Sequence, residues 1–173
     1  TQAAKLAETA GADGITAHLR EDRRHISDRD LINLKKELTI PLNLEMAATN
    51  EMLKIAVERS PNAVCIVPEN REEITTEGGL DVVKSKNYLD RYVRELSHAG
   101  SRVSIFIDPE INQIDACAKI GAPVVELHVG QFCDDSKNKS FHYERILNAV
   151  ERAKVLGIEC HAGHGLTFDT VIP

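Results

Sequence analysis

The chain has 173 residues, of which 42% are hydrophobic and 28% are charged, a balance typical of folded globular proteins and not of disordered or collagen-like chains. Its 21 Lys and Arg against 27 Asp and Glu leave a net charge of −6, which argues against nucleic acid or an acidic membrane surface as its partner. We find no apolar run near the roughly 18 residues of a membrane span, no signal peptide and no closely spaced pair among the four cysteines, so we expect a single cytoplasmic domain with free thiols.

Helical and strand-like hydrophobic periods alternate along the first half of the chain. In order, the pattern predicts a helix ended by Gly11, a strand over 13–19, a helix begun by the capping-box spacing of Ser27 and Asp30, a strand over 42–46, a helix capped by Thr49, and a strand buried on both faces over 63–68. A helix followed by a strand is therefore repeated three times.

The second half of the chain repeats this order. The pattern predicts a helix over 88–96 ended by Gly100, a strand over 102–107, a helix starting at Asp108-Pro109 with proline in the first helical position, a strand over 123–129, a helix over 143–150 ended by Gly157, and a strand over 158–163. Six strands in strict alternation with six helices predict a parallel sheet.

Two parallel architectures fit this alternation, a doubly wound open sheet and a (β/α)8 TIM barrel. No G-x-G-x-x-G sequence follows a strand, which removes the best signature of a dinucleotide-binding open sheet. Titratable side chains follow the carboxyl ends of at least four strands, the face on which barrel enzymes build their sites: His18, Arg20, Glu45, Glu126, His128, His161 and His164. Six strands are two fewer than a barrel needs, so residues 1–173 are predicted to form one (β/α)8-barrel domain that is incomplete at both ends and lacks the first and last strands.

Alternation within the strands indicates which side chains face the barrel lumen. Helices cover the outer face, so the apolar residues must point outward and His18, Glu45 and Glu126 inward. Desolvation and neighbouring charge can bring the pKa values of such carboxyl groups towards neutrality, where they serve as general acids and bases. The alternative is that Glu45 or Glu126 only pairs with Arg20 or a lysine inside the barrel.

Three further features suggest ligand contacts near the strand ends. Arg20 keeps strand parity with His18 and could bind a phosphate through two hydrogen bonds. His164 lies between two glycines, which allow a close backbone approach to an anion, and the long polar loop over 69–80 is typical of a lid. A zinc site is the competing interpretation, although these side chains lack the spacing of the usual helical zinc motif: His18, His128, Cys160, His161 and His164.

The chain resembles the pyridoxine 5′-phosphate synthase family in six segments that occur in the family's order: GADGITAHLREDRRHISDRD, LNLEMA, VPENREEITTEGGLDV, IDPE, GAPVVELHVG and AGHGLT. The resemblance implies a (β/α)8-barrel enzyme of the transferase class that condenses 1-deoxy-D-xylulose 5-phosphate with 3-amino-2-oxopropyl phosphate. The products would be pyridoxine 5′-phosphate, inorganic phosphate and water. It also implies no metal and no organic cofactor, small phosphorylated substrates as partners, and a homo-oligomer that is commonly an octamer.

The resemblance assigns catalytic roles to four residues. It implies that His18 is an acid–base group and that Glu45 is the main general base, which relays protons during imine formation and dehydration. Glu126 would stabilise a charged intermediate, and His164 would act as a proton donor.

Substrate contacts are implied for a second set of residues. Arg20 would bind phosphate and His25 would lie in the same site, while Thr75 and Gly165 would touch the ligand. The chain departs from the family because it lacks the opening Asn-x-Asp-His strand and the closing Asn-x-Gly-His segment. It also has His161 where the family usually has asparagine.

Two other functions fit the same residues. A barrel enzyme of the aldolase or isomerase type would use the phosphate ligands on another sugar phosphate. A truncated barrel would bind phosphate ligands without catalysis. Turnover of the two phosphorylated precursors distinguishes the synthase from both.

Overall fold

The structure is a computed structural model that describes residues 1–69 and 78–171. Its strands are β1 (Ile15–His18), β2 (Leu42–Met46), β3 (Ala63–Ile66), β4 (Arg102–Ile107), β5 (Val124–His128) and β6 (Glu159–Gly163). Its helices are α1 (Gln2–Thr9), α2 (Asp28–Glu37), α3 (Asn50–Arg59), α4 (Val82–His98), α5 (Ile111–Lys119), α6 (Gly130–Asp134) and α7 (Lys139–Val155). Within these described ranges, no helix is both long and apolar enough to cross a membrane.

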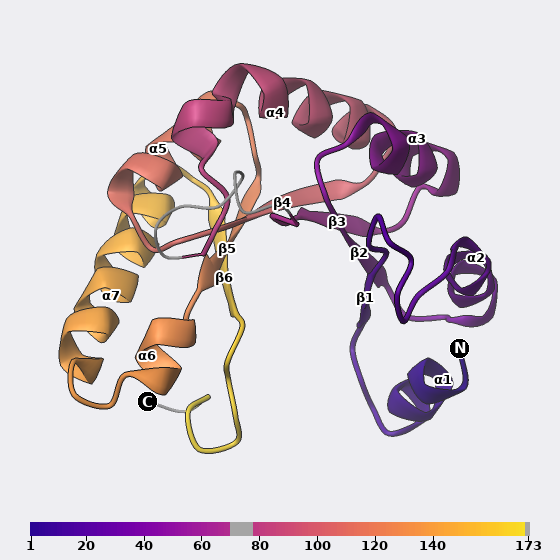
Figure 1. The fold of residues 1–173 in the computed structure, drawn as a ribbon, viewed down its shortest axis with the longest axis horizontal. Coiled ribbons are helices and arrows are strands. Elements are labelled where there is room, and N and C mark those ends of the chain that lie inside the picture. Colours follow the sequence, from indigo (N-terminus) through magenta and orange to yellow (C-terminus); the bar gives the residue numbers. More distant parts are fainter. Residues whose placement is uncertain (70–77, 172–173) are drawn as a thin grey trace.

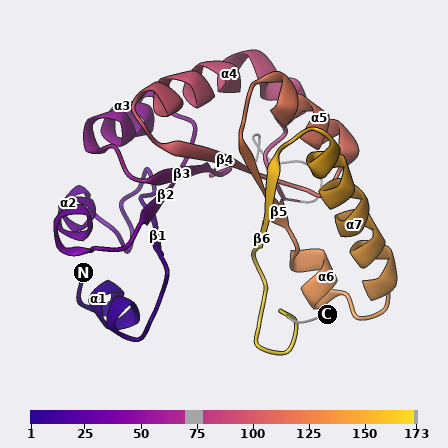
Figure 2. The same ribbon diagram turned by 180° about the vertical axis from the view of Figure 1, so that it is seen from behind.

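The six strands form one parallel sheet in the sequential order β1-β2-β3-β4-β5-β6. A doubly wound sheet would instead reverse its strand order at a switch point. Figure 1 shows the sheet curled like part of a barrel wall, with α2, α3, α4, α5 and α7 on its outer side. The view from behind shows α1 and α6 on opposite sides of the opening (Figure 2). The fold is therefore an α/β, TIM-barrel-like half-barrel, which confirms the predicted class.

The outer face of the sheet holds the main hydrophobic core. In β2, Leu42, Leu44 and Met46 are at most 2% exposed, whereas Asn43 and Glu45 between them are only partly buried. This alternation places the apolar set under the helices and the polar set towards the lumen, as the strand parity predicted. A smaller apolar cluster lies on the lumen side: Cys65, Val67 and Phe106.

Local signals set most element boundaries. The predicted strands over 42–46 and 102–107 match β2 and β4, and the other four strands are shorter than predicted by one or more residues. Positive φ angles at Gly11, Gly100 and Gly157 confirm the helix ends expected there, because the left-handed region is open to glycine. The four cysteines are free thiols, as expected.

Two predictions about helices are wrong. Helices and strands do not alternate strictly, because both α6 and α7 lie between β5 and β6. The helix expected to start at Asp108-Pro109 begins at Ile111, after Glu110 in the N-cap position. Asp108 is only 1% exposed and accepts a hydrogen bond from the Gly79 N–H at 3.2 Å, so its carboxylate binds another loop instead of capping the helix.

The capping box predicted at the start of α2 is present. The Asp30 N–H donates to Ser27 Oγ at 3.3 Å, and the Ser27 N–H donates to Asp30 Oδ2 at 3.0 Å. We expect Ser27→Ala to lower the free energy of unfolding by about 1 kcal/mol, because one amide at the helix start loses its acceptor. Urea denaturation measures this loss. Ser97→Ala, at an exposed site within α4, is the control, and an equal effect of both changes would contradict the prediction.

Candidate active site

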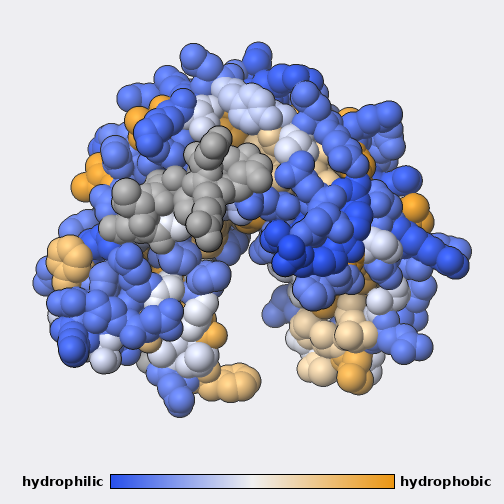
Figure 3. Space-filling model, viewed as in Figure 1, coloured by the Kyte–Doolittle hydropathy of each residue, from blue (hydrophilic) through white to orange (hydrophobic). Residues whose placement is uncertain are grey.

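A cavity of about 530 Å³ lies at the carboxyl ends of the strands. All six strands or the residues just after them supply its lining, which consists of His18, Glu45, Val67, Pro68, Gly78, Phe106, Glu126, His128 and His164. The space-filling view shows the molecule hollowed between the arm that carries α1 and the arm that carries α6 and α7 (Figure 3). The four residues predicted to be catalytic therefore share one cavity, although up to 146 positions separate them in sequence (164 − 18).

His18 and Glu45 meet because β1 and β2 pair in register, His18 opposite Glu45. His18 Nδ1 lies 3.7 Å from Glu45 Oε2, and both side chains are 26% exposed. On its other side, His18 Nε2 is hydrogen bonded to Glu69 Oε1 at 3.0 Å. An imidazole between two carboxylates can pass a proton from one side of the ring to the other.

Glu126 projects into the cavity from β5, and its surroundings favour its neutral form. Burial, followed by the charge of Glu45, raises the pKa of the Glu126 carboxyl, and these effects outweigh the hydrogen bond from Cys65 and the charge of His161. Cys65 Sγ donates to Glu126 Oε2 at 3.7 Å, and burial raises the pKa of this thiol, so it stays protonated as a donor. A Cβ at Gly163 would lie 2.1 Å from Glu126 Oε1, so a larger residue there would push this carboxyl group aside.

The raised pKa of Glu126 predicts how stability depends on pH. The folded chain holds this proton more tightly than the unfolded chain does. Its contribution to stability therefore falls as pH rises from the unfolded-state pKa, about 4.3, through the higher folded-state value. Glu126→Gln should increase the free energy of unfolding at pH 8, and this gain should disappear below about pH 4. Urea denaturation between pH 4 and 8 measures it, and a gain that does not change with pH would contradict the prediction.

His164 and His128 form the opposite wall of the cavity. Their ring centroids are 4.8 Å apart, and the rings of Phe106 and His128 form a T-shaped pair with centroids 5.4 Å apart. His164 has φ of 70°, an uncommon conformation for a residue with a side chain, and functional sites are where such backbone strain gathers. Asp108 Oδ1 lies 3.3 Å from His128 Nδ1 and anchors that ring from behind.

Three of the residues predicted to bind substrate, Arg20, His25 and Gly165, are not part of this lining. Arg20 lies just past β1, where its Nε is 3.3 Å from Asp22 Oδ1, so the alternative in which Arg20 pairs with Glu45 or Glu126 is not seen. His25 is exposed in the following loop with φ of 68°. Gly165 has φ of 85° and packs on the backbone of Gly130. Thr75 lies outside the described residues.

Three residues near the cavity are not among the predicted catalytic or substrate-binding residues. For His128 the signal is strand parity, which places it in the lumen on the same face as Glu126. Glu69 stands three residues past β3, at the start of the long polar loop, and no local pattern indicates its contact with His18. Asp108 was interpreted as a helix start, because an Asp-Pro pair at the end of a strand is more typical of a cap.

The side chains do not assemble the zinc site considered above. Among residues 1–69 and 78–171, no three His, Cys, Asp or Glu side chains are grouped as a metal ion requires. Cys160 and His161 lie on β6, where His161 Nε2 is 2.7 Å from Glu159 Oε1. His18 and His128 instead interact with Glu69 and Asp108.

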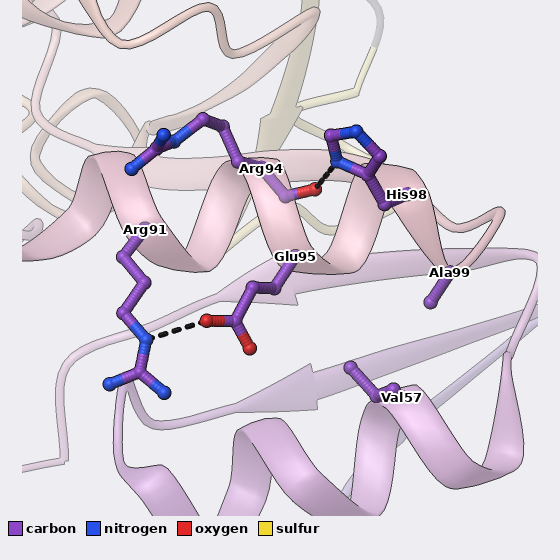
Figure 4. Close-up of a pocket in the computed structure, with 6 residues that line it drawn as sticks. All are labelled: Val57, Arg91, Arg94, Glu95, His98 and Ala99. Atoms are coloured by element: carbon purple, nitrogen blue, oxygen red, sulfur yellow. Dashed lines mark hydrogen bonds and ion pairs between the residues drawn. The ribbon is translucent and has the colours of Figure 1, made fainter.

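A second hollow of about 550 Å³ lies on the outer surface between α3 and α4 (Figure 4). Its charged groups are exposed and are already satisfied by near neighbours. Arg91 Nε donates to Glu95 at 2.6 Å, Arg94 lies 2.9 Å from Asp90, and His98 Nδ1 is 2.7 Å from the Arg94 carbonyl oxygen. This hollow lacks partly buried carboxyl groups such as Glu45 and Glu126. The cavity at the strand ends is therefore the candidate active site.

Solved structures with similar folds differ widely from this chain in sequence. A mandelate oxidase mutant bound to (S)-mandelic acid superimposes with a TM-score of 0.61 at 15% identity, over 92% of this chain and 55% of the other. The D-psicose 3-epimerase of Clostridium cellulolyticum H10, with D-tagatose, has a TM-score of 0.60 at 11% identity, over 94% of this chain and 67% of the other. At such low identity the likeness supports the fold alone.

Sequence comparison is far more specific. The family model described as pyridoxal phosphate biosynthesis protein PdxJ matches residues 1–173. The pyridoxine 5′-phosphate synthase of Rhodospirillum rubrum is 59% identical over 99% of this chain and 70% of its own length. The enzyme of the same name from Zymomonas mobilis is 59% identical over 99% of this chain and 68% of its own length. A family model that covers the whole chain and relatives of this identity show that the chain belongs to the PdxJ family of pyridoxine 5′-phosphate synthases.

Proposed function

We propose that this chain condenses 1-deoxy-D-xylulose 5-phosphate with 3-amino-2-oxopropyl phosphate to pyridoxine 5′-phosphate, inorganic phosphate and water. The observation that carries the proposal is one cavity that holds Glu45, Glu126, His18 and His164 at the carboxyl ends of the strands. Joining an amine to a carbonyl and then closing an aromatic ring requires several proton transfers and the loss of water. Two carboxyl groups and two imidazoles in a shared, partly enclosed space suit that chemistry.

The proposed roles follow from the surroundings of each group. Glu45 takes protons from the condensing carbons and nitrogen and passes them on, and His18, with Nδ1 3.7 Å away, is the next group in this exchange. His164, opposite on the cavity wall, donates a proton to a departing oxygen. Burial and Glu45 favour the neutral form of Glu126 in the free cavity. Positive charge on the nitrogen of an intermediate favours its ionised form, and the carboxylate then stabilises that charge strongly because water is excluded.

Arg20, His25, Thr75 and Gly165 complete the proposal as substrate contacts. Arg20 and His25 stand on the loop that follows β1, next to His18, and the side chain of Arg20 is 29% exposed. An exposed partner such as Asp22 holds an arginine weakly, so a phosphate dianion can replace it. Gly165 has no side chain and a left-handed backbone, which allow a ligand to approach its backbone closely.

The direct test mixes the protein with both precursors and follows pyridoxine 5′-phosphate by its fluorescence after chromatography. Each precursor alone and a protein-free mixture are the controls. Product above these controls is expected. Turnover of a different sugar phosphate, with none of this pair, would indicate an aldolase or isomerase instead. Binding of the precursors without any product would indicate a non-catalytic barrel.

We further propose, from the family resemblance, that the chain assembles into a homo-oligomer, an octamer in the simplest case, and works in the cytoplasm. Exposed apolar side chains give a surface that such an assembly would cover, among them Leu6 at 72% and Val155 at 74%. Light scattering coupled to size-exclusion chromatography measures the assembled mass. A monomer at micromolar concentration would contradict the proposed assembly.

A further inference from the structure

The carboxylate of Glu69 is buried at the edge of the active-site cavity. Glu69 lies in the loop after β3, and its side chain is only 4% exposed. Its Oε1 is hydrogen bonded to His18 Nε2 at 3.0 Å, and its Oε2 accepts a hydrogen bond from the Glu21 N–H at 3.1 Å. One carboxyl group thus binds both the end of β1 and the loop that follows it. A buried carboxyl group is stable in a folded protein only where hydrogen-bond partners such as these replace the water that it loses.

This contact favours a proton on Nε2 of His18. An ionised carboxylate can only accept hydrogen bonds, so Nε2 must be the donor in the neutral ring. The lone pair then lies on Nδ1, the atom that faces Glu45 Oε2 at 3.7 Å. The gap is too long for a hydrogen bond here, but catalytic contacts commonly shorten once substrate binds. In this tautomer, His18 can receive a proton from Glu45.

We propose that Glu69 is a positioning residue for His18, which holds the imidazole as the Nε2–H tautomer with Nδ1 directed at Glu45. This inference rests on the proposed acid–base role of His18. Glu69 itself does not line the cavity, so it acts through the histidine and not on the substrate. The arrangement follows a general rule, in which a buried carboxylate orients a catalytic imidazole and selects its tautomer.

Glu69→Gln separates this role from simple anchoring. A glutamine has the same shape, and its amide oxygen can still accept from the Glu21 N–H while its NH₂ group donates to His18 Nε2. Both contacts of the loop survive, but Nε2 must now accept, so the proton moves to Nδ1. We expect kcat for pyridoxine 5′-phosphate formation to fall about 10²-fold, with KM and the urea denaturation midpoint unchanged. Glu69→Asp keeps the charge and should recover part of the lost rate.

The tautomer is read directly from ¹⁵N–¹H spectra of histidine-labelled protein, with the His18 signals assigned by their loss in His18→Gln. The wild type should show Nε2–H, and Glu69→Gln should show Nδ1–H. The matched control is Glu159→Gln, which removes another glutamate beside a histidine, since Glu159 Oε1 is 2.7 Å from His161 Nε2 outside the cavity lining. It should leave both kcat and the His18 signals unchanged.

Each outcome bears on the inference in one direction. A switched tautomer together with the loss of kcat supports it. A switched tautomer with wild-type kcat, or a loss of kcat with an unchanged tautomer, overturns it. A wild type that forms no pyridoxine 5′-phosphate would refute the proposed function. The spectra of the wild type and Glu69→Gln would even then show whether Glu69 sets the tautomer of His18, so the two failures are distinguished.

Discussion

Replacing Glu45 with glutamine is expected to lower turnover by about 10²- to 10⁴-fold, the range typical for loss of a general base. Glu45 lines the cavity from β2, beside His18 and near enough to Glu126 to raise the pKa of that carboxyl. Glutamine has the same size as glutamate, and its amide oxygen can still accept hydrogen bonds. The amide cannot take up a proton, however. The fall should therefore appear in kcat, measured from initial rates of pyridoxine 5′-phosphate formation, and much less in KM.

The matched control is Glu144→Gln, at an exposed position on α7 that is not part of the cavity lining, which should keep wild-type turnover. Circular dichroism and urea denaturation should show that both variants fold. The charge of Glu45 raises the pKa of Glu126, so Glu45→Gln should also lower the pKa of Glu126 in a ¹³C NMR titration. Wild-type turnover in Glu45→Gln would remove the role proposed for this residue.

Gly79→Ala is expected to cause the largest loss of stability, about 3 kcal/mol, the upper part of the range for overpacking. A Cβ there would lie 2.3 Å from the Asp108 backbone nitrogen and 2.5 Å from the Ile107 carbonyl carbon. Both atoms belong to the backbone at the end of β4, which cannot move aside as a flexible side chain can. Urea denaturation measures the loss of unfolding free energy.

The same change should impair catalysis through Asp108. The Gly79 N–H donates to Asp108 Oδ1, and that oxygen lies 3.3 Å from His128 Nδ1, so a displaced Gly79 moves the support of a cavity-lining ring. Gly157→Ala is the control, because its Cβ would meet open space and only the left-handed backbone, φ 71°, costs about 1–2 kcal/mol. A loss in Gly79→Ala no greater than in Gly157→Ala would contradict the steric argument.

Much of the fold could be predicted from the sequence because its signals are local. The period of the apolar residues identified all six strands, and capping residues such as Ser27 and Thr49 marked helix starts that the structure confirms. The predicted start of a helix was wrong where the polar residue expected to cap it binds a partner far away in sequence. Asp108 resembles a cap in sequence, but its carboxylate binds the Gly79 N–H, 29 residues away.

The sequence by itself determined the class of fold and which side chains face the lumen. Strand parity alone placed His18, Glu45 and Glu126 on one face, because successive side chains of a strand point to opposite sides whatever surrounds it. Family membership followed from motifs as well.

Only the tertiary structure decided which of these groups touch. The strand register sets His18 opposite Glu45, and the path of the loop after β3 brings Glu69 onto the other side of the imidazole, 51 residues away in sequence. Arg20 shows the converse, because parity favoured the lumen but the side chain lies beside Asp22 outside the cavity lining. Such contacts depend on sheet curvature, register and competition between partners, and no local pattern of residues encodes them.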